Sequence, residues 1–420
     1  MTTYDKRHIA HFDLDAFFVS VECLKDARLK GKPLLVGGAG DRGVVAACSY
    51  EARRFGIHSA MPMKLARRLC PEAIVIRGDM ESYAKHSRIV TDIIQENVPL
   101  FEKASIDEFY IDLTGMDKFF GCRLFTRELR DRVLKNSGLP VSYGLASNKL
   151  ISKVATGEVK PNGQIEIPFG EEKNFLSPLP VARLPGIGKD TAYKLIRRGV
   201  ETIRTLSEIP IEMMETLLGK NGIDLWRKAN GIDESPIIPY REQKSISTER
   251  TFETDTIHLG FLHAELVRMT ESIGFDLRKQ DKLTGCVTIK LRYSNFDTVV
   301  RQKTIDYTNA DHILLQTAQE IFDKLYDRRL LIRLLGIRFT RMVPGNYQIK
   351  LYEDTQEMIN LYQSIDSIKR RFGEASLMRA VGLRQGSGHL RGGPEHKNRT
   401  LGMYVQSIPI AHKGAPEEPG

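Results

Sequence analysis

The hydrophobic pattern of the chain changes character several times along its length. Through residues 8–165, short runs rich in apolar residues predict strands, and longer stretches with helical periodicity lie between them. Residues 174–232 carry helical periodicity only, and residues 245–343 return to alternating strands and helices. The pattern therefore predicts a multidomain α+β chain with an α/β region, a helical region and a second α/β region.

The boundaries follow from these periods and from the residues that interrupt them. Strands are expected at residues 8–14, 34–37, 43–48, 73–76, 109–113 and 141–146, and helices at 16–30, 60–69, 81–98 and 122–136. In the last region, strands are expected at 245–252, 285–293, 298–305 and 334–342, with helices at about 258–280, 310–328 and 355–372. Residues 233–244 are typical of a linker, and the polar tail 384–420 is expected to be mobile.

Two acidic segments interrupt the apolar strands. Residues 104–112 place Asp107 and Glu108 in an otherwise apolar run, and the period of two in residues 8–15 places Asp13 and Asp15 on one face. Unpaired buried carboxylates cost several kcal/mol, which a cation would offset. Two such strands side by side would suit Mg²⁺, and two ions about 4 Å apart can clamp an in-line phosphoryl displacement. A solvated acidic face is the alternative at this point.

The amino-acid composition indicates which class of partner and which cellular compartment to expect. The 420 residues include 62 Lys and Arg against 53 Asp and Glu, and the net charge of +9 favours a polyanion such as nucleic acid. The five cysteines form no CxxC pair, so neither a disulfide framework nor a zinc site is indicated, and a reducing compartment is expected. No apolar run is long enough to span a bilayer and the N-terminus lacks a signal-peptide pattern, so we expect a cytoplasmic protein without a membrane partner.

Two segments of the first region could contact phosphate. Tyr50 and Arg53 lie three residues apart at a predicted strand-to-helix junction, where both side chains can share a helical face and a phosphate. Lys160 precedes a Pro-Asn-Gly turn, which would hold its ammonium at a loop edge within reach of a triphosphate. A surface pair and an ordinary loop lysine are the alternatives.

Two further segments are suited to DNA. The turn that contains Gly186, Gly188 and Lys189 lets backbone N–H groups approach a phosphate, as a helix-hairpin-helix does, although it could be a plain helix–helix turn. In the last region, polar and basic residues alternate with apolar ones, which predicts a sheet with one basic face suited to a duplex. A solvated sheet face is the alternative. The basic residues of this pattern are Lys290, Arg292 and Arg338.

In this order the segments resemble the Y-family (translesion) DNA polymerases, in particular the bacterial polymerase IV branch. The resemblance covers about residues 5–343 and implies a right-hand architecture. The implied domains, in chain order, are a palm (about 1–13 and 74–165), fingers (14–73) and a helix-hairpin-helix thumb (166–232). A linker (233–243), an α/β little finger (244–343) and a C-terminal extension (344–420) would follow. The motifs that carry the resemblance are Asp13-Leu14-Asp15-Ala16-Phe17-Phe18, Ser49-Tyr50-Glu51-Ala52-Arg53, Ser105-Ile106-Asp107-Glu108, Ser147-Asn148-Lys149, Lys160-Pro161-Asn162-Gly163 and Leu184-Pro185-Gly186-Ile187-Gly188.

The resemblance also implies roles for single residues. Two Mg²⁺ ions would be held by Asp13, Asp107, Glu108 and the carbonyl of Leu14, whereas Asp15 ranks below these ligands. Phe18 would be the steric gate that excludes a 2′-hydroxyl, and Val44 and Ala46 would cover the nascent base pair. The residues that match nucleotide-binding positions are Phe17, Phe18, Tyr50, Arg53 and Lys160.

The implied activity is template-directed, low-fidelity addition of deoxynucleotides to a primer 3′ end in translesion synthesis. Primer-template DNA and deoxynucleoside triphosphates would be the substrates, a monomer would suffice, and the domain plan contains no separate exonuclease cluster. Two alternatives remain, a catalytically silent DNA-binding scaffold and a palm-fold nucleotide cyclase.

A short segment after the last predicted strand resembles the peptide with which bacterial polymerases dock on the sliding clamp. It reads Gln348-Ile349-Lys350-Leu351-Tyr352, where Ile and Tyr replace the usual Leu and Phe. Gln348, Leu351 and Tyr352 would contact the clamp. An incidental amphipathic pentapeptide is the alternative.

Overall fold

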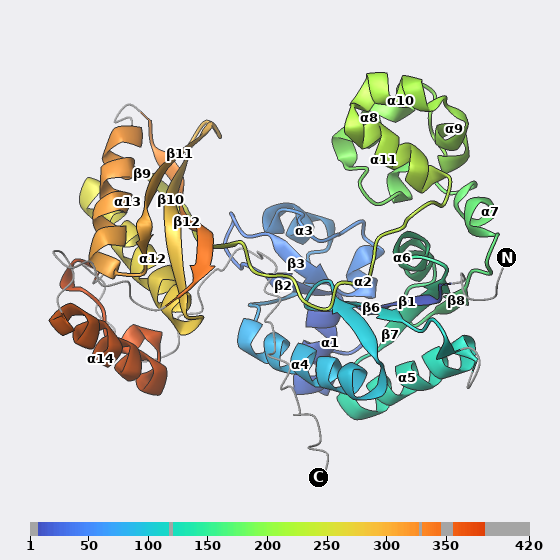
Figure 1. The fold of residues 1–420 in the computed structure, drawn as a ribbon, viewed down its shortest axis with the longest axis horizontal. Coiled ribbons are helices and arrows are strands. Elements are labelled where there is room, and N and C mark those ends of the chain that lie inside the picture. Colours follow the sequence, from blue (N-terminus) through green and yellow to red (C-terminus); the bar gives the residue numbers. More distant parts are fainter. Residues whose placement is uncertain (1–6, 117–120, 327–329, 346–355, 383–420) are drawn as a thin grey trace, which may run out of the picture. The chain divides into compact units, whose positions relative to one another are not determined.

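The structure, a computed structural model, describes residues 7–116, 121–326, 330–345 and 356–382. The chain divides into two compact units, one that ends at Arg241 and one that begins at Glu242 (Figure 1). They are called the N-terminal unit and the C-terminal unit below. Within the described ranges, no helix is both long and apolar enough to cross a membrane.

A five-stranded sheet in the order β5-β6-β1-β7-β8 forms the centre of the N-terminal unit. Its strands are β1 (Ile9–Leu14), β5 (Leu100–Lys103), β6 (Glu108–Asp112), β7 (Val141–Ala146) and β8 (Gln164–Glu166). One face, with Phe12 and Phe109, packs on α1 (Phe17–Lys25), α4 (Met80–Asn97) and α5 (Cys122–Ser137). Because side chains alternate along a strand, Asp13 and Glu108 lie on the opposite face, where α6 (Lys149–Glu158) contacts β1.

A second, smaller sheet in the order β3-β2-β4 completes the α/β part of this unit. It contains β2 (Leu34–Gly37), β3 (Val45–Cys48) and β4 (Ile74–Ile76), with α2 (Tyr50–Arg53) and α3 (Met63–Leu69). The predicted helix over residues 16–30 is wrong beyond Lys25. The backbone of Asp26 is extended, and its carboxylate accepts from the Arg28 N–H at 3.0 Å, which ends α1 and starts the short 3₁₀ helix η1 (Ala27–Leu29).

Residues 172–229 form a helical bundle with its own apolar core. Its helices are α7 (Glu172–Leu176), η3 (Val181–Arg183), α8 (Lys189–Ile196), α9 (Ile203–Glu208), α10 (Ile211–Leu218) and α11 (Lys220–Ala229). Leu150, Ile151 and Val154 of α6 belong to the same core.

The segment after this bundle has neither helix nor strand, yet residues 233–241 are fixed to the central sheet. The buried Glu102 carboxylate on β5 accepts from Lys149 Nζ at 2.6 Å, the Ile238 N–H at 2.9 Å and Arg241 at 3.1 Å. Ile237 packs beside β1 and β6. This stretch is called the anchored segment below.

The C-terminal unit is a four-stranded sheet in the order β11-β10-β12-β9 with helices on one face (Figure 1). Its strands are β9 (Ser245–Thr256), β10 (Lys282–Tyr293), β11 (Thr298–Thr308) and β12 (Ile332–Pro344), and the helices are α12 (Leu259–Lys279) and α13 (Asp311–Leu325). Val287, Ile289 and Leu291 pack under the helices. The alternation therefore leaves Lys290 and Arg292 on the open face.

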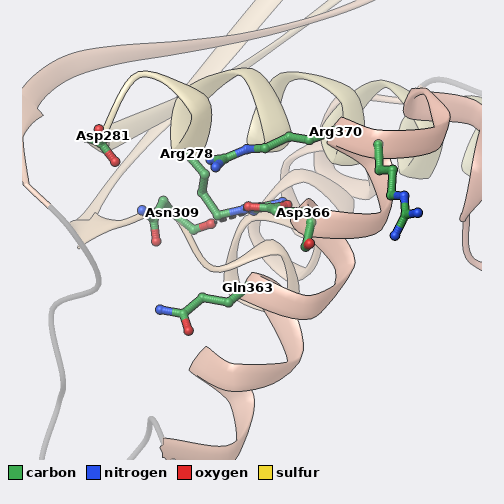
Figure 2. A pocket seen from close by; sticks show the side chains of 8 residues that line it. Arg278, Asp281, Asn309, Gln363, Asp366 and Arg370 are labelled. Carbon is green, nitrogen blue, oxygen red and sulfur yellow. Dashed lines mark hydrogen bonds and ion pairs between the residues drawn. The ribbon is translucent and has the colours of Figure 1, made fainter.

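A further helix, α14 (Gln356–Phe372), contacts α12 through Asp366 and α13 through Tyr362, and it is followed by η4 (Glu374–Ser376) and η5 (Ala380–Gly382). Arg278 of α12 is buried between two carboxylates, bonding Asp311 at 2.7 Å and Asp366 of α14 at 2.8 Å. Figure 2 shows Arg278 and Asp366 together at the wall of a polar groove of about 600 Å³. A buried ion pair thus ties α14 to the rest of the unit.

Candidate active site

The sheet register brings together the acidic residues of the two predicted strands. Asp13 on the central strand β1 lies directly opposite Glu108 on β6 and opposite Ser142 on β7. The Leu14 N–H donates to the Asp107 carbonyl at 3.1 Å, which places the backbone of Leu14 beside Asp107. The four predicted metal ligands therefore lie at one end of the β1–β6 pair.

Lysines neutralise part of this acidic cluster. Lys160 forms an ion pair with Asp13, and Lys153 of α6 donates to both oxygens of Glu108 at 2.8 and 2.7 Å. Asp107 accepts from the Ser105 hydroxyl at 2.6 Å. Each carboxylate thus has a donor.

The environment nevertheless disfavours the charged forms of two of these acids. Burial raises the pKa of Asp13 to about 7, helped by Asp107 and Glu108, although Lys160 acts in the opposite direction. Burial also raises the pKa of Asp107, against the Ser105 hydrogen bond. The raised carboxyl pKa values thus come mainly from burial of neighbouring acids, which Lys160 offsets only in part.

The donor set is compatible with a divalent cation, although the side chains do not form a closed site as they stand. Among the described residues, no three His, Cys, Asp or Glu side chains converge closely enough to hold a metal ion. Three carboxylates and a backbone carbonyl are all hard oxygen ligands of the kind that Mg²⁺ prefers. The two lysines occupy carboxylate oxygens that an ion would take.

The predicted triphosphate ligands surround the same strand end. The guanidinium of Arg53 lies over the ring of Tyr50, 4.3 Å from its centroid, at the short helix α2. Lys160 lies in the turn before β8, where its ammonium pairs with Asp13. The expected sharing of a helical face by Tyr50 and Arg53 is therefore present in the structure.

The predicted steric gate is part of an aromatic stack. The ring of Phe18 lies 4.3 Å from that of Tyr83 at an interplanar angle of 13°, and the Tyr83 hydroxyl donates to Glu22 at 2.7 Å. Phe17 and Phe18 both belong to the core of the N-terminal unit, and Phe18 is the more exposed of the two, at 7% against 3%. Tyr83 was missed in the sequence because a single tyrosine on a helix gives no signal.

The residues expected over the nascent base pair are accessible. Val44 and Ala46 are exposed, whereas Val45 between them is buried in the core of the small sheet. Two small side chains therefore face away from the sheet core, as a shallow cover requires.

The predicted DNA contacts lie on a turn of the N-terminal unit and on two strands of the C-terminal unit. Gly186 has a φ of 104°, which favours glycine, and Gly188 is the N-cap of α8, whose first residue is Lys189. On the open face of the C-terminal sheet, Lys290 donates to Glu249 at 2.9 Å, and Thr288 lies opposite Arg338 in register. Arg292 bonds the Thr298 hydroxyl at 2.9 Å.

One further element of the site escaped the sequence analysis. Helix α6, which supplies Lys153, was not predicted, although Asn148 caps it by accepting from the Ile151 N–H at 3.0 Å. An Asn followed by apolar residues at helical spacing was the signal. The clamp-like peptide Gln348–Tyr352 lies outside the described residues.

Comparison with known proteins identifies the class. Models of the impB/mucB/samB family match residues 12–157 and, for its C-terminal domain, residues 243–351. A model described as the thumb domain of DNA polymerase iota matches residues 182–233. A solved Y-family DNA polymerase chimera of Dbh and Dpo4 superposes with a TM-score of 0.72 at 25% identity, over 80% of this chain and 100% of that chain.

Curated relatives narrow the class to one branch. DNA polymerase IV of Dehalococcoides mccartyi is 39% identical over 375 residues, which is 88% of this chain and 96% of the relative. The DNA polymerase IV of Desulfatibacillum aliphaticivorans is 35% identical over 376 residues, 88% of this chain and 95% of the relative. The DNA polymerase IV of Listeria innocua is 36% identical over 345 residues, which is 81% of this chain and 97% of the relative.

The fold and these relatives place the chain in the Y-family of DNA polymerases, and it belongs to the DNA polymerase IV branch of that family. The expected right-hand fold and the interpretation as a translesion DNA polymerase are thereby confirmed. Membership implies a divalent-metal-dependent reaction on DNA and deoxynucleoside triphosphates. The cyclase alternative is set aside, since the matches include the thumb and the C-terminal domain.

Proposed function

We propose that this polymerase adds deoxynucleotides to a primer 3′ end at Asp13, Asp107 and Glu108, using two Mg²⁺ ions. The observation that carries the proposal is the register of β1 and β6, which sets Asp13 opposite Glu108 while burial raises the pKa of Asp13 to about 7. Three acids gathered at a strand end are suited to binding cations together with substrate phosphates, in place of the two lysines that pair with them here. The carbonyl of Leu14 is the proposed fourth ligand.

When bound, Mg²⁺ lowers the pKa of the primer hydroxyl and neutralises charge on the phosphates. The protein's own residues position the substrates. Arg53 and Lys160 supply positive charge to the β and γ phosphates, and Tyr50 orients Arg53 through the ring contact. Phe18 limits the space at the sugar, and Val44 and Ala46 give a shallow cover for the base pair.

The domain assignment is part of the same proposal. The palm comprises about residues 1–13 and 74–165, the fingers 14–73, the thumb 166–232 and the little finger 244–343. Gly186, Gly188 and Lys189 of the thumb grip the DNA backbone, together with Lys290, Arg292 and Arg338 of the little finger. Action as a monomer and a cytoplasmic location stay predictions.

The test of the metal site is Asp107→Ala and Glu108→Ala, each assayed by primer extension and by primer-template binding. Both variants should lose nucleotide addition almost completely and keep DNA binding, because the proposed DNA contacts lie on other elements. Asp112→Ala is the matched control, since Asp112 lies on the same strand opposite Ile9 and accepts only from the Thr114 N–H among the bonds of the described chain. Near-normal extension by Asp107→Ala or Glu108→Ala would contradict the assignment.

We also propose that residues 348–352 dock on a sliding clamp, with Leu351 and Tyr352 as apolar anchors. Replacing both by alanine should abolish clamp-stimulated processivity and leave basal distributive synthesis unchanged, because the peptide lies outside the catalytic region. Truncating such anchors costs about 1–3 kcal/mol each. Binding of the double variant to the host clamp with wild-type affinity would show that the peptide is incidental.

A further inference from the structure

Asp15 is a buried carboxylate close to the proposed metal site, and its hydrogen bonds indicate a role other than metal binding. It is only 2% exposed and follows directly after β1. Its Oδ1 accepts from the Tyr50 hydroxyl at 3.1 Å and from Ser142 at 2.9 Å. Its Oδ2 accepts from Ser142 at 2.8 Å and from the Asn162 backbone N–H at 2.8 Å.

The donors to Asp15 come from three separate elements. Tyr50 begins α2, Ser142 lies on β7, and Asn162 belongs to the turn between α6 and β8. Ser142 extends the connection, because its hydroxyl accepts from the Gly163 N–H at 3.2 Å. Buried carboxylates are stabilised by such charge-assisted bonds, and one that joins three elements fixes their relative positions.

These elements carry the proposed triphosphate ligands. The Tyr50 ring that Asp15 holds by its hydroxyl lies against the guanidinium of Arg53 at 4.3 Å. The turn that Asp15 holds by the Asn162 N–H begins at Lys160, two residues earlier in the chain. Asp15 therefore contacts Tyr50 and the turn that begins at Lys160, and it acts on Arg53 through the Tyr50 ring, while the Lys160 ammonium itself also pairs with Asp13.

We propose that Asp15 is the positioning residue of the triphosphate site, holding Tyr50, Arg53 and the Lys160 turn in place rather than binding metal. This inference rests on the proposed function of those residues. Both oxygens of Asp15 accept from hydroxyl and backbone donors of α2, β7 and the adjoining turn. Asp13 and Glu108 are instead paired with the ammonium groups of Lys160 and Lys153, which are side-chain cations that a metal ion could replace. Positioning groups of this kind act through substrate binding and orientation.

The test compares Asp15→Ala with Asp15→Asn. Alanine removes every acceptor, whereas asparagine can still accept from the Asn162 N–H and donate to the Tyr50 and Ser142 hydroxyls, which can rotate to accept. Asp15→Ala should raise the KM for the incoming deoxynucleotide about 10- to 100-fold, the range for losing bonds to a charged group, with a smaller change in kcat. Asp15→Asn should restore most of that affinity.

Two readouts separate positioning from metal binding. With a dideoxy-terminated primer, where no chemistry occurs, the Kd of the correct deoxynucleotide should rise in Asp15→Ala by the same factor as KM. The Mg²⁺ concentration for half-maximal rate, measured at saturating nucleotide, should stay at the wild-type value. Asp112→Ala is the control for loss of a carboxylate on the same sheet, and it should leave the KM, the Kd and the Mg²⁺ requirement unchanged.

The outcomes are distinguishable. A wild-type nucleotide Kd in Asp15→Ala overturns the inference, as does a raised Mg²⁺ requirement with unchanged nucleotide affinity, which would make Asp15 a ligand. If Asp15→Ala does not fold, Ser142→Ala removes the hydroxyl that bonds both Asp15 oxygens, and it should raise the nucleotide Kd in the same direction. Full activity in Asp107→Ala would instead contradict the proposed function itself.

Discussion

The two larger sheets carry their charged residues in opposite ways. On the N-terminal sheet, Asp13 and Glu108 face each other across two strands, in surroundings where burial raises the pKa of Asp13 to about 7. On the C-terminal sheet, Lys290, Arg292 and Arg338 are spread over the open face of two strands, and Arg338 is exposed. Concentrated charge can do chemistry at one point, whereas spread charge attracts a polyanion without reading its sequence.

This difference predicts how each region responds to mutation. A single change near the acidic strand end should alter the reaction by orders of magnitude. Changes on the basic face should be graded, because each cation contributes its own share of the attraction for a polyanion.

The largest effect is expected from Phe18→Ala, which tests whether one residue near the acidic end controls sugar selection. Removal of the ring should raise ribonucleotide incorporation by orders of magnitude and cost much less in deoxynucleotide addition. The measurement is the ratio of kcat/KM for matched deoxy- and ribonucleotides. Phe55→Ala removes an exposed ring from the same part of the chain and should leave the ratio unchanged. Unaltered discrimination in Phe18→Ala would assign the gate to another residue.

Arg278→Met tests whether the buried ion pairs of Arg278 stabilise the C-terminal unit. The substitution leaves Asp311 and Asp366 buried without their shared cation, which costs about 3–5 kcal/mol in comparable buried pairs. Urea unfolding, with hydrogen exchange of α14 as the local probe, should show the loss. Arg371→Met, at an exposed residue of the same groove that is not part of the buried ion pair, should change stability by no more than about 0.5 kcal/mol. Equal effects of the two variants would show that the buried network does not hold α14.

Neutralising Lys290, Arg292 and Arg338 together should weaken DNA binding on all sequences alike. The dependence of log K on log salt should flatten by up to about 3 units, at most about one unit for each cation removed. Because Glu249 already pairs with Lys290, that single substitution should contribute least. An unchanged salt slope in the triple variant would place the DNA on another face of the domain.

The smallest effect concerns Lys103 on β5, a half-buried lysine whose pKa burial lowers to about 8. The unfolded chain binds this proton more tightly, so the Lys103 contribution to stability rises as pH increases from about 8 towards 10.5. Lys103→Met should therefore stabilise the protein more at pH 7 than at pH 10. The measurement is the free energy of unfolding of the variant and the wild type at the two pH values. The exposed Lys85→Met is the control. A pH-independent difference would contradict the assigned shift.

The sequence predicted well what depends on local periodicity. The strands at 34–37 and 141–146 were placed at their observed limits, and the alternation around Lys290 correctly predicted a sheet with one apolar face. Asp26 shows the limit of that approach, because one side chain that caps the backbone ends a helix whose apolar pattern continues.

Hydrogen bonds between residues far apart in the sequence could not be predicted from local periodicity. Asp15 meets Ser142 and Asn162 across 127 and 147 residues of chain, and no periodicity encodes such contacts. The sequence marked Asp15 as an acid beside Asp13, but only the structure shows that its oxygens are engaged by hydroxyl and backbone donors. The pairing of Lys153 with Glu108 was hidden for the same reason.

The contacts of the anchored segment limit where residues can be inserted or deleted between the two units. Composition marks residues 233–241 as a spacer, where insertions and deletions are ordinarily tolerated. Here the Ile238 N–H and Arg241 both converge on the buried Glu102 carboxylate, so a shift of one residue would withdraw donors from a charge that also pairs with Lys149. Residues 242–243 meet Lys282 of the C-terminal unit instead. Tolerance to inserted residues is therefore confined to the junction of Arg241 and Glu242.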